Sequence, residues 1–378
     1  MNASQKRLRI GVLFGGRSGE HEVSLASAAS VIRALDPEKY EAVPIGISKD
    51  GRWLVGTGSL KMLADVLKSG DRVVLPPDPS AAALVPWGPS AVQPSVSVDV
   101  VFPVLHGTFG EDGTVQGLLE LAGLPYVGAG VLASAVGMDK DVQKRLFEQA
   151  GLPIVPFLAI RRSEWEHERA KVLQAIKKKF RFPIFVKPAT LGSSVGMTRL
   201  KTAQEIPAAL DLAAEFALKI IVERGVTGRE IEVSVLGNDE LRASIPGEIV
   251  PHREYYDYRA KYLEQGTQLL IPARLTKKQV GIFQDYAVRA FRAIDGTGMA
   301  RCDFFLEKRT GKIFVNELNT IPGFTSISMY PKLWEASGLP YPKLIDRLIA
   351  LAIELHRDKA RTKYSIELPS GASGALDA

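Results

Sequence analysis

The stretch Arg7–Leu35, RLRIGVLFGGRSGEHEVSLASAASVIRAL, indicates the fold class of this chain. It begins with the apolar run Arg7–Phe14, passes through glycines and continues into Ser24–Leu35, where apolar residues recur at helical spacing. Ser24 is a candidate N-cap for that helix. The alternation of strand and helix continues with runs at Tyr40–Ile47, Ser95–Leu105 and Val115–Ala122. Apolar strands that alternate with helices predict an α/β domain built on an open, largely parallel sheet.

The length of 378 residues allows about two to three domains, at roughly 150 residues each. Strand and helix patterns divide the chain into three α/β segments. We therefore expect an N-terminal domain over 1–138, a central domain over 139–225 and a C-terminal domain over 226–368. The last residues, 369–378, are small and polar and are predicted to be disordered. The proline-rich stretch 70–94 shows no clear period and is predicted to be a surface excursion.

The composition excludes several classes of protein. Hydrophobic residues make up 46% and charged residues 24%, which permits a sizeable core and argues against wholesale disorder. The single cysteine, Cys302, can form neither an intrachain disulfide nor a zinc cluster. Because neither an apolar run of about 18 residues nor a signal peptide is seen, we expect a cytoplasmic protein without a membrane partner. A net charge of +6 permits binding of anionic small molecules but does not indicate nucleic acid.

A lysine followed by glycines and serines, Lys187–Gly196 (KPATLGSSVG), is a candidate for phosphate binding. An apolar strand delivers the lysine, the glycines let backbone N–H groups approach phosphate oxygens, and the serines add hydroxyl donors. The lysine precedes the glycines, so the motif is not a Walker A loop. The alternative is an ordinary hairpin turn at the surface.

Two strand-like runs, Met299–Phe305 (MARCDFF) and Lys312–Asn319 (KIFVNELN), predict a hairpin with a polar face. Their register depends on the turn between them. A three-residue loop, Arg309–Gly311, has glycine where a type I turn with a bulge needs a left-handed residue. This loop would place Asp303 directly opposite Glu317, whereas a two- or four-residue loop would send the two carboxylates to opposite faces.

The same register places Arg301 opposite Asn319, so that two carboxylates, an amide and a guanidinium converge. Carboxylates this close repel each other unless a cation lies between them, and hard oxygen ligands suit Mg²⁺. The alternative is a solvated ladder of salt bridges. We expect the apolar side chains of Ile313 and Val315 on the same face, which would make that face partly buried and favours the metal site.

Two glycine-rich loops follow predicted strands of the N-terminal part, Gly15–Ser24 (GGRSGEHEVS) and His106–Gly113 (HGTFGEDG). Open α/β sheets bind ligands at the carboxyl ends of their strands, so both loops are expected to line one crevice. Glu20 is placed to hold an ammonium group. The alternative for a glutamate at the start of a helix is a favourable interaction with the helix dipole alone.

Two other motifs carry less information. Gly128–Ala133 matches the dinucleotide pattern G-x-G-x-x-A, but Asp139 and Asp141 follow too closely to be the ribose-binding acid expected about 20 residues on. Glu254–Tyr262 (EYYDYRAKY) mixes aromatic and charged residues without a clear period. We interpret it as a mobile lid over substrate, and not as a nucleic-acid stripe, because it is one short loop in a weakly basic chain. No nucleic-acid partner is therefore expected.

Together, these motifs resemble the D-alanine–D-alanine ligase family of the ATP-grasp superfamily, over roughly residues 9–349. The motifs that carry the resemblance are GGRSGEHEVS, HGTFGEDGTVQG, KPATLGSSVGM, EYYDYRAKY, RCDFF and NELNTIPGFTSIS. The resemblance implies a three-domain ATP-grasp fold with ATP between the central and C-terminal domains. It also implies ATP-dependent joining of two D-alanine molecules through an acyl phosphate, for peptidoglycan precursor synthesis, by a homodimer. These motifs leave D-serine open as the second substrate.

The resemblance further implies roles for individual residues. ATP would contact Lys140, Lys187, Glu223, Arg224, Val226, Glu230 and Lys261. Two Mg²⁺ ions, replaceable by Mn²⁺, would be held by Asp303, Glu317 and Asn319. The amino-acid substrates would contact Glu20, His106, Arg301, Ser326 and Ser328. The residues that act in catalysis would be Glu20, Ser193, Tyr262 and Arg301.

Two other functions stay open on the sequence. One is an ATP-grasp ligase that takes a different carboxylate and amine. The other is a nucleotide-binding regulatory protein without turnover. Phosphate release from ATP in the presence of D-alanine, D-serine, D-lactate or L-alanine separates these readings.

Overall fold

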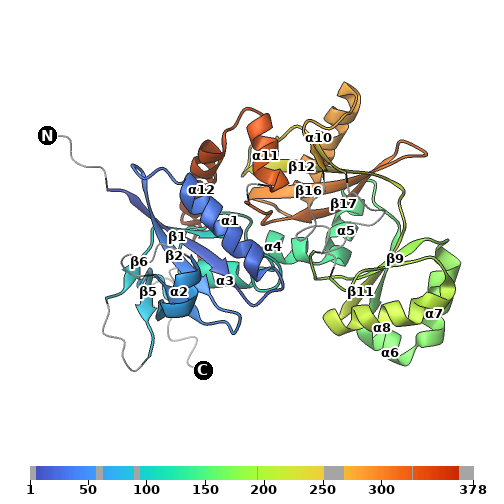
Figure 1. Ribbon diagram of the computed structural model, residues 1–378, viewed down its shortest axis with the longest axis horizontal. Helices are drawn as coiled ribbons and strands as arrows, with labels where there is room; N and C mark the ends of the chain where they lie inside the picture. The colour runs from blue at the N-terminus through green and yellow to red at the C-terminus, as the bar shows by residue number, and fades with distance from the viewer. Residues whose placement is uncertain are drawn as a thin grey trace, which may run out of the picture.

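The computed structural model describes residues 6–56, 63–88, 94–193, 195–250, 268–325 and 327–365. Three β-sheets lie along the long axis of the molecule, each covered by helices (Figure 1). The predicted lid at 254–262 and the predicted tail at 369–378 lie outside the described residues. Within the described ranges, no helix combines the length and the apolar character that crossing a membrane requires.

The first sheet has the strand order β6-β5-β4-β3-β2-β1-β7. Its strands are β1 (Leu8–Gly15), β2 (Tyr40–Ile47), β3 (Trp53–Val55), β4 (Asp71–Val74), β5 (Ala83–Pro86), β6 (Val96–Ser97) and β7 (Val100–Pro103). β1 pairs in parallel with β2 and β7, as the opening stretch predicts, but the four pairings that add β3 to β6 are antiparallel, so the sheet is mixed and not largely parallel as expected. Its helices are α1 (His21–Ala34), α2 (Leu63–Ser69) and α3 (Thr114–Leu121).

Two other expectations for this region are wrong. The stretch 70–94 is not a surface excursion, because it supplies β4 and β5 of the sheet. Pro76, Pro77 and Pro79 stand between these short strands, where no ladder hydrogen bond is lost, and Pro86 ends β5; these prolines obscured the pattern. Ser24 is not the N-cap either, because α1 begins at His21. The Ser24 hydroxyl instead accepts from Gly15 N at 2.8 Å and donates to the Val104 carbonyl.

The second sheet is antiparallel, in the order β10-β9-β11-β8. Its elements are β8 (Phe157–Arg161), α6 (Arg162–His167), α7 (Arg169–Lys179), β9 (Ile184–Pro188), β10 (Thr198–Leu200), the 3₁₀ turn Ala203–Glu205, α8 (Ile206–Phe216) and β11 (Lys219–Arg224). Side chains alternate between the two faces of a strand. Val186 and Val222 therefore pack against α7 and α8, while Lys187 and Glu223 point to the other face.

The third sheet has the order β15-β14-β12-β16-β17, with β13 paired to β12. Its strands are β12 (Gly228–Gly237), β13 (Arg242–Ala243), β14 (Gly247–Val250), β15 (Gln268–Leu270), β16 (Gly298–Glu307) and β17 (Ile313–Asn319). One face packs on α10 (Lys277–Ala293), α4 (Val131–Met138) and α5 (Lys140–Gln149) in a single core. Cys302 is fully buried in this core, where burial raises the pKa of its thiol.

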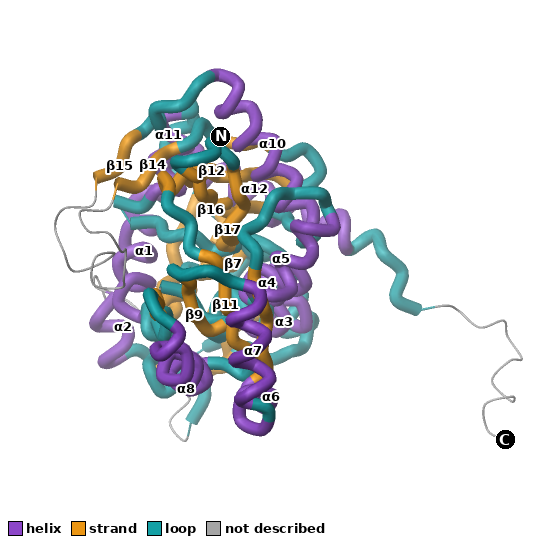
Figure 2. The backbone as a smooth tube through the Cα atoms, turned by 90° about the vertical axis from the view of Figure 1, so that its right-hand side faces the viewer, coloured by secondary structure: helices purple, strands orange, loops and turns teal. Residues whose placement is uncertain are grey.

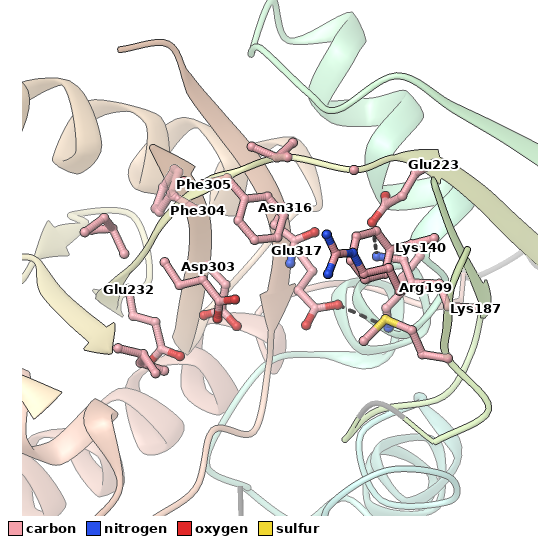
Figure 3. Close-up of a pocket in the computed structure, with 18 of the residues that line it drawn as sticks. Lys140, Lys187, Arg199, Glu223, Glu232, Asp303, Phe304, Phe305, Asn316 and Glu317 are labelled. Carbon is pink, nitrogen blue, oxygen red and sulfur yellow. Dashed lines mark hydrogen bonds and ion pairs between the residues drawn. The ribbon is translucent and has the colours of Figure 1, made fainter. Parts of the chain in front are cut away.

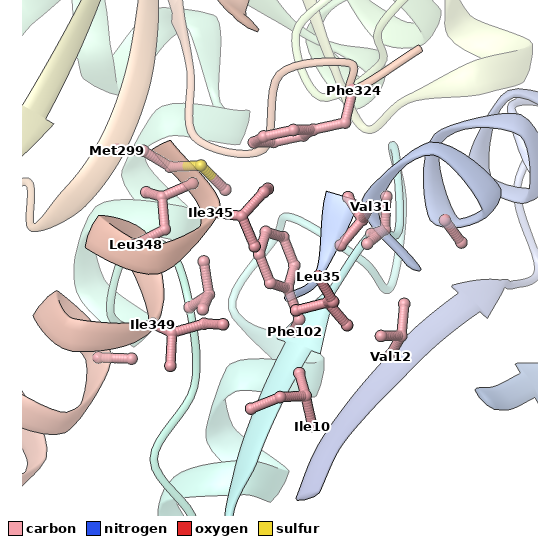
Figure 4. Packing of buried hydrophobic residues seen from close by; sticks show 14 of the residues in the cluster. Ile10, Val12, Val31, Leu35, Phe102, Met299, Phe324, Ile345, Leu348 and Ile349 are labelled. Carbon is pink, nitrogen blue, oxygen red and sulfur yellow. The ribbon is translucent and has the colours of Figure 1, made fainter. Parts of the chain in front are cut away.

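A further hydrophobic core joins the first sheet to the C-terminal helices α11 (Met329–Ala336) and α12 (Tyr341–Lys359). Figure 4 shows Ile345 and Leu348 of α12 facing Phe102 of β7. Phe324 meets Phe102 edge to face, with 5.7 Å between the ring centroids. In Figure 2 the strands gather in the centre of the molecule and most helices lie at its periphery. Segments from both ends of the chain thus share one core.

Candidate active site

A cavity of about 530 Å³ lies between the second and third sheets. One wall comes from β9, β10, β11 and the segment after β9, and the other from β12, β14, β16 and β17 (Figure 3). Of the residues expected to contact ATP, those that line the cavity are Lys140, Lys187, Glu223, Arg224, Val226 and Glu230. Lys261 lies outside the described residues.

The β16–β17 hairpin brings the predicted polar residues together by a route that differs from the prediction. The expected pairs are present, namely Arg301 with Asn319 and Asp303 with Glu317. The loop, however, has four residues, 308–311, and not three. A β-bulge at Asn316 adds one residue to the second strand and shifts the register back. The expected pairing is therefore confirmed, whereas the loop expected to produce it is wrong.

The bulge also reverses an expectation about burial. Ile313 and Val315 precede the bulge, so they point away from Glu317 and pack in the core of the third sheet. The expectation that they share its face is wrong, because strict alternation fails at a bulge. Asn316 lines the cavity, and its Oδ1 is buried without a hydrogen-bond partner in the described part of the chain.

Arg301 is held between two carboxylates. Its Nε and Nη2 donate to Asp303 Oδ1 and Oδ2, both at 2.7 Å. Its Nε also lies 3.1 Å from Glu232 Oε2 on the neighbouring strand β12. Burial alone would lower the pKa of Arg301, but Asp303 and Glu232 raise it well above its ordinary value. Asn319 Nδ2 donates to Asp303 Oδ2 at 3.0 Å. Arg301, Asp303, Glu317 and Asn319 together form a polar patch.

Lys140 places a second positive charge on this patch. Its Nζ lies 3.2 Å from Glu317 Oε2 and donates to the Leu191 carbonyl at 3.0 Å. Each of the two facing carboxylates therefore has a cationic partner from the protein itself. Their mutual repulsion does not by itself require a metal ion, contrary to the argument from the sequence.

The oxygen donors of the patch nevertheless fit a hard cation. The carboxylates of Asp303 and Glu317 and the amides of Asn316 and Asn319 are the ligand types that Mg²⁺ prefers. Among the residues that the structure describes, no group of three or more His, Cys, Asp or Glu is arranged to hold a metal. The amide oxygens or substrate oxygens would therefore have to complete the coordination.

A buried lysine–glutamate–lysine cluster adjoins the cavity at the second sheet. Glu223 Oε1 accepts from Lys187 Nζ at 2.6 Å, and Glu223 Oε2 lies 3.2 Å from Lys144 Nζ. Burial alone would raise the pKa of Glu223, but the two lysines lower it to about 2. The pKa of Lys144 is lowered by burial. The Glu223 carboxylate is therefore ionised at neutral pH.

The glycine-rich loops of the first two regions meet at Glu20. The Ser193 hydroxyl donates to Glu20 Oε1, and the Ser193 backbone has a left-handed φ of +52°. A Cβ added to Gly107 or Gly192 would lie 3.2 or 3.3 Å from Glu20 Oε2. Three loops that the sequence identified separately thus converge on one carboxylate.

Two further ionisable groups are buried beside these loops. His106 Nδ1 lies 3.1 Å from the Ile321 carbonyl oxygen and Nε2 lies 3.3 Å from Ser27 Oγ, and burial lowers the pKa of the imidazole. Glu111 accepts a backbone N–H at 3.1 Å. Burial, and next the charge of Glu20, raise the pKa of Glu111 to about 8. Both groups are therefore neutral near pH 7.

The remaining expected residues lie apart from these clusters or outside the described residues. Ser328 is the N-cap residue of α11 and accepts from Thr325 N at 3.0 Å. Arg224 lines the cavity, but its Nη1 donates to Glu307 Oε1 at 2.8 Å and its guanidinium stacks on Phe314. The expected residues outside the described ranges are Ser326, Lys261 and Tyr262.

Sequence reasoning missed three residues of the site. Lys144 follows Lys140 by four positions, and this spacing places both on one helix face. Glu232 follows Glu230 by two positions, which places both on one face of a strand. Both spacings are visible in the sequence and could have identified Lys144 and Glu232 as site residues. Asn316 gave no signal, because the bulge depends on how the hairpin packs.

The chain is similar to known proteins over nearly its whole length. Residues 9–129 match the family model for the D-ala D-ala ligase N-terminus, and residues 146–350 match that for the D-ala D-ala ligase C-terminus. The D-alanine–D-alanine ligase of Heliobacterium modesticaldum is 52% identical over 353 residues, which are 93% of this chain and 96% of that protein.

Two solved structures extend the likeness to the fold. The D-alanine-D-alanine ligase from Coxiella burnetii is 40% identical with a TM-score of 0.82, covering 94% of this chain and 97% of that one. The VanG D-Ala:D-Ser ligase from Enterococcus faecalis is 37% identical with a TM-score of 0.82, covering 92% and 100%.

The fold and the cavity define the class of the protein. Two sheets that enclose a cavity lined by lysines and carboxylates form an ATP-grasp fold, and the chain is an ATP-dependent ligase. Within that class, it belongs to the D-alanine–D-alanine ligase family.

Proposed function

We propose that this protein joins two D-alanine molecules to D-alanyl-D-alanine with the consumption of ATP, for the synthesis of peptidoglycan precursors. The family membership and the named relatives support the substrates. The observation that carries the proposal is the contact of Ser193 with Glu20. This contact joins the segment after Lys187, a lysine that lines the cavity, to the loop that precedes α1. The phosphate and the ammonium group of a phosphorylated substrate would therefore have binding partners next to each other.

The charge of the cavity supports a polyphosphate ligand. Lys140 and Lys187 point into the cavity from α5 and β9 (Figure 3). The cluster of Lys144, Lys187 and Glu223 holds two positive charges and one negative charge, so one positive charge is left over for a phosphate. We assign the phosphates to Lys140 and Lys187, and the base and ribose to the wall that contains Glu223, Arg224, Val226 and Glu230.

We further propose that Asp303, Glu317 and Asn319 hold Mg²⁺, with Mn²⁺ as a substitute, in two sites. The bound ion would neutralise charge during phosphoryl transfer. Before it binds, Arg301 and Lys140 occupy the carboxylates, so these two cations have to give way or share them. The buried Oδ1 of Asn316 is a further oxygen at the same place.

The chemistry follows from the poor reactivity of a carboxylate. The carboxylate of the first D-alanine attacks the γ-phosphorus of ATP, which gives an acyl phosphate and ADP. The amine of the second D-alanine then attacks the acyl carbon, and phosphate leaves. Glu20 accepts hydrogen bonds from the first ammonium group. Arg301 stabilises the oxyanion of the tetrahedral intermediate, a contact worth on the order of 3 kcal/mol.

The proposal assigns supporting roles to the other expected residues. His106, Ser326 and Ser328 would contact the amino-acid substrates. Lys261 and Tyr262 would come from a lid, with Lys261 at the γ-phosphate and Tyr262 linked to Glu20. Exclusion of water by such a lid would protect the acyl phosphate from hydrolysis.

A phosphate-release assay tests the reaction. The protein is incubated with ATP and Mg²⁺, together with D-alanine, D-serine, D-lactate or L-alanine, alone and in pairs. We expect strong release with D-alanine alone, and D-alanyl-D-alanine as the product by mass spectrometry. Release that requires D-alanine together with D-serine would instead assign the activity named for VanG. No release with any acceptor would reject a ligase of this kind.

We also propose a cytoplasmic homodimer. The exposed apolar side chains of Leu121, Val131 and Leu132 on the neighbouring helices α3 and α4 support self-association, because large exposed apolar groups often mark interfaces. Sedimentation analysis would reveal the mass of a dimer, and a monomer at all concentrations would contradict it.

We place the domain boundaries at 138/139 and 225/226, which leaves each of the three sheets within one segment.

A further inference from the structure

Lys144 is a fully buried lysine that the proposed reaction does not place in contact with a substrate. It lies on α5, one turn after Lys140, with none of its surface exposed. Its Nζ contacts Glu223 Oε2 at 3.2 Å and lies 5.9 Å from the centre of the Phe157 ring. Burying an ammonium group costs free energy unless the group is paired with an anion. We therefore ask what function this buried ion pair has.

The two lysines that share Glu223 differ in their access to the cavity. Lys187 lines the cavity and bonds Glu223 Oε1 at 2.6 Å. Lys144 does not line it and approaches the other oxygen of the carboxylate from α5. A phosphate that enters the cavity would compete with Glu223 for Lys187. It would not reach Lys144 in the same way.

This difference keeps Glu223 ionised after a nucleotide binds. If Lys187 turns to a phosphate, Lys144 remains as the countercharge of Glu223. Without Lys144, burial would favour the protonated carboxyl group. An ionised carboxylate only accepts hydrogen bonds, whereas a protonated one can also donate. The state of Glu223 therefore decides which groups on a base it can face.

We propose that Lys144 is a positioning residue for base selection in the nucleotide site. By fixing Glu223 as an acceptor-only carboxylate, it makes the site accept a purine nucleoside triphosphate with an amino group at position 6. The same carboxylate rejects a purine with a carbonyl oxygen there, because two acceptors face each other. This inference rests on the proposed function, in which Glu223 lies at the base.

The test compares ATP with ITP, whose base carries a carbonyl oxygen at position 6 and has no other exocyclic group. The quantity measured is the ratio of the KM for ITP to the KM for ATP, in the phosphate-release assay with D-alanine. For the unaltered protein we expect a ratio on the order of a hundred, since a site built to bond one group discriminates strongly against its replacement. In Lys144→Met this ratio should fall by about tenfold or more, because the KM for ITP falls relative to the KM for ATP whatever the change in kcat.

A double-mutant cycle separates positioning from a general structural effect. Glu223→Gln should reduce the ratio, and Lys144→Met should have no further effect on the ratio in the Glu223→Gln background. The matched control is Lys219→Met, which removes a lysine from the same strand as Glu223, where Lys219 pairs with Asp139 and Asp141. This control should leave the ratio unchanged.

The outcomes distinguish the inference from the function beneath it. An unchanged ratio in Glu223→Gln would place Glu223 away from the base and remove that part of the proposed function. A reduced ratio in Glu223→Gln with an unchanged ratio in Lys144→Met would overturn the role of Lys144 alone. If Lys144→Met does not fold, Lys144→Arg and Lys144→Gln replace it. The charged variant should then keep the ratio and the neutral one should lose it, and equal ratios would overturn the proposal.

Discussion

At the scale of single residues, Arg301 has two carboxylate partners, and only one of them is also a proposed metal ligand. Asp303 chelates the guanidinium and is also a proposed magnesium ligand. Glu232 is only 4% exposed and approaches from β12. A metal ion that takes Asp303 would leave Arg301 with Glu232. Glu232 therefore keeps the guanidinium in place at the stage when the oxyanion forms.

Glu232→Gln should lower kcat by on the order of tenfold, which corresponds to about 1.4 kcal/mol of transition-state stabilisation. The KM for ATP should change little, because Glu232 acts through Arg301. Steady-state kinetics with ATP and D-alanine measure both parameters. Glu41→Gln, which removes an exposed partner of Arg9, is the control and should behave like the unaltered protein. A normal kcat in Glu232→Gln would show that Asp303 suffices.

Glu111 should give the protein a pH-dependent stability. Burial, and next Glu20, raise its pKa from 4.5 to about 8. Between these values the folded protein keeps a proton that the unfolded chain has lost, so the stability from this group is present below pH 4.5 and is lost as pH rises through 8. Glu111→Gln removes this dependence.

Urea unfolding at several pH values measures this effect. Between about pH 5.5 and 8.5, the free energy of unfolding of the unaltered protein should fall by roughly 3 kcal/mol more than that of Glu111→Gln. The matched control is Glu38→Gln, because Glu38 is exposed. Parallel pH profiles for all three proteins would mean that Glu111 titrates at its ordinary pKa in the fold.

At the scale of elements, the β16–β17 hairpin separates what a sequence can and cannot determine. The alternation of polar and apolar residues predicted the pairs around Asp303 correctly. Turn chemistry predicted a loop one residue too short, and local pattern did not reveal the bulge at Asn316. The two errors cancel at the site and remain visible at Val315, which faces the opposite side from that expected.

Deletion of Asn316 should produce a regular hairpin that keeps the same facing pairs. With the bulge removed and the four-residue loop kept, Asp303 still lies opposite Glu317. We expect a Tm within about 5 °C of the unaltered protein, since the ladder is not weakened. The Mg²⁺ concentration for half-maximal activity should rise, because an oxygen donor is lost.

Asn316→Ala keeps the bulge and removes only the amide, so it is the matched control for the deletion. Titration of activity with Mg²⁺ and thermal melts should give the same metal effect in both variants. A deletion variant that fails to fold, beside a stable Asn316→Ala, would show that the chain beyond Asn319 needs the extra residue. Unchanged Mg²⁺ dependence in both would remove Asn316 from the metal site.

Other elements follow the same division between local and distant causes. The parallel strands β1, β2 and β7 were predictable, because long apolar runs with glycine turns are local signals. The short strands β4 and β5 were not, because their pairing with neighbours defines them more than their own residues do. Lys144 was visible as a helical neighbour of Lys140, but its burial depends on β11, far along the chain.

At the scale of the whole molecule, one core connects the two ends of the chain. Phe324 is fully buried and contacts the rings of Phe102, Tyr330 and Tyr341. Its backbone N also donates to Ser27 Oγ at 3.3 Å, in the helix that follows Glu20. The third sheet and the loop that holds Glu20 are therefore positioned by shared packing.

Phe324→Ala should destabilise the protein by about 3–5 kcal/mol, the usual cost of removing a buried aromatic ring. Hydrogen exchange should show that amides of β1, β7 and α12 lose protection together. The control is Phe216→Ala, because Phe216 is 43% exposed on α8. Loss of protection in α12 alone would contradict a core shared by both ends.

The same core has a consequence for the order in which the protein matures during synthesis. The first sheet emerges early from the ribosome, but the surface of β7 and α1 that packs on α12 stays uncovered until Tyr341–Lys359 has been made. More than 200 residues are translated in between, at roughly 5–20 residues per second. The early part of the nascent chain therefore exposes an apolar surface for on the order of ten seconds or longer, and is a natural client for a chaperone.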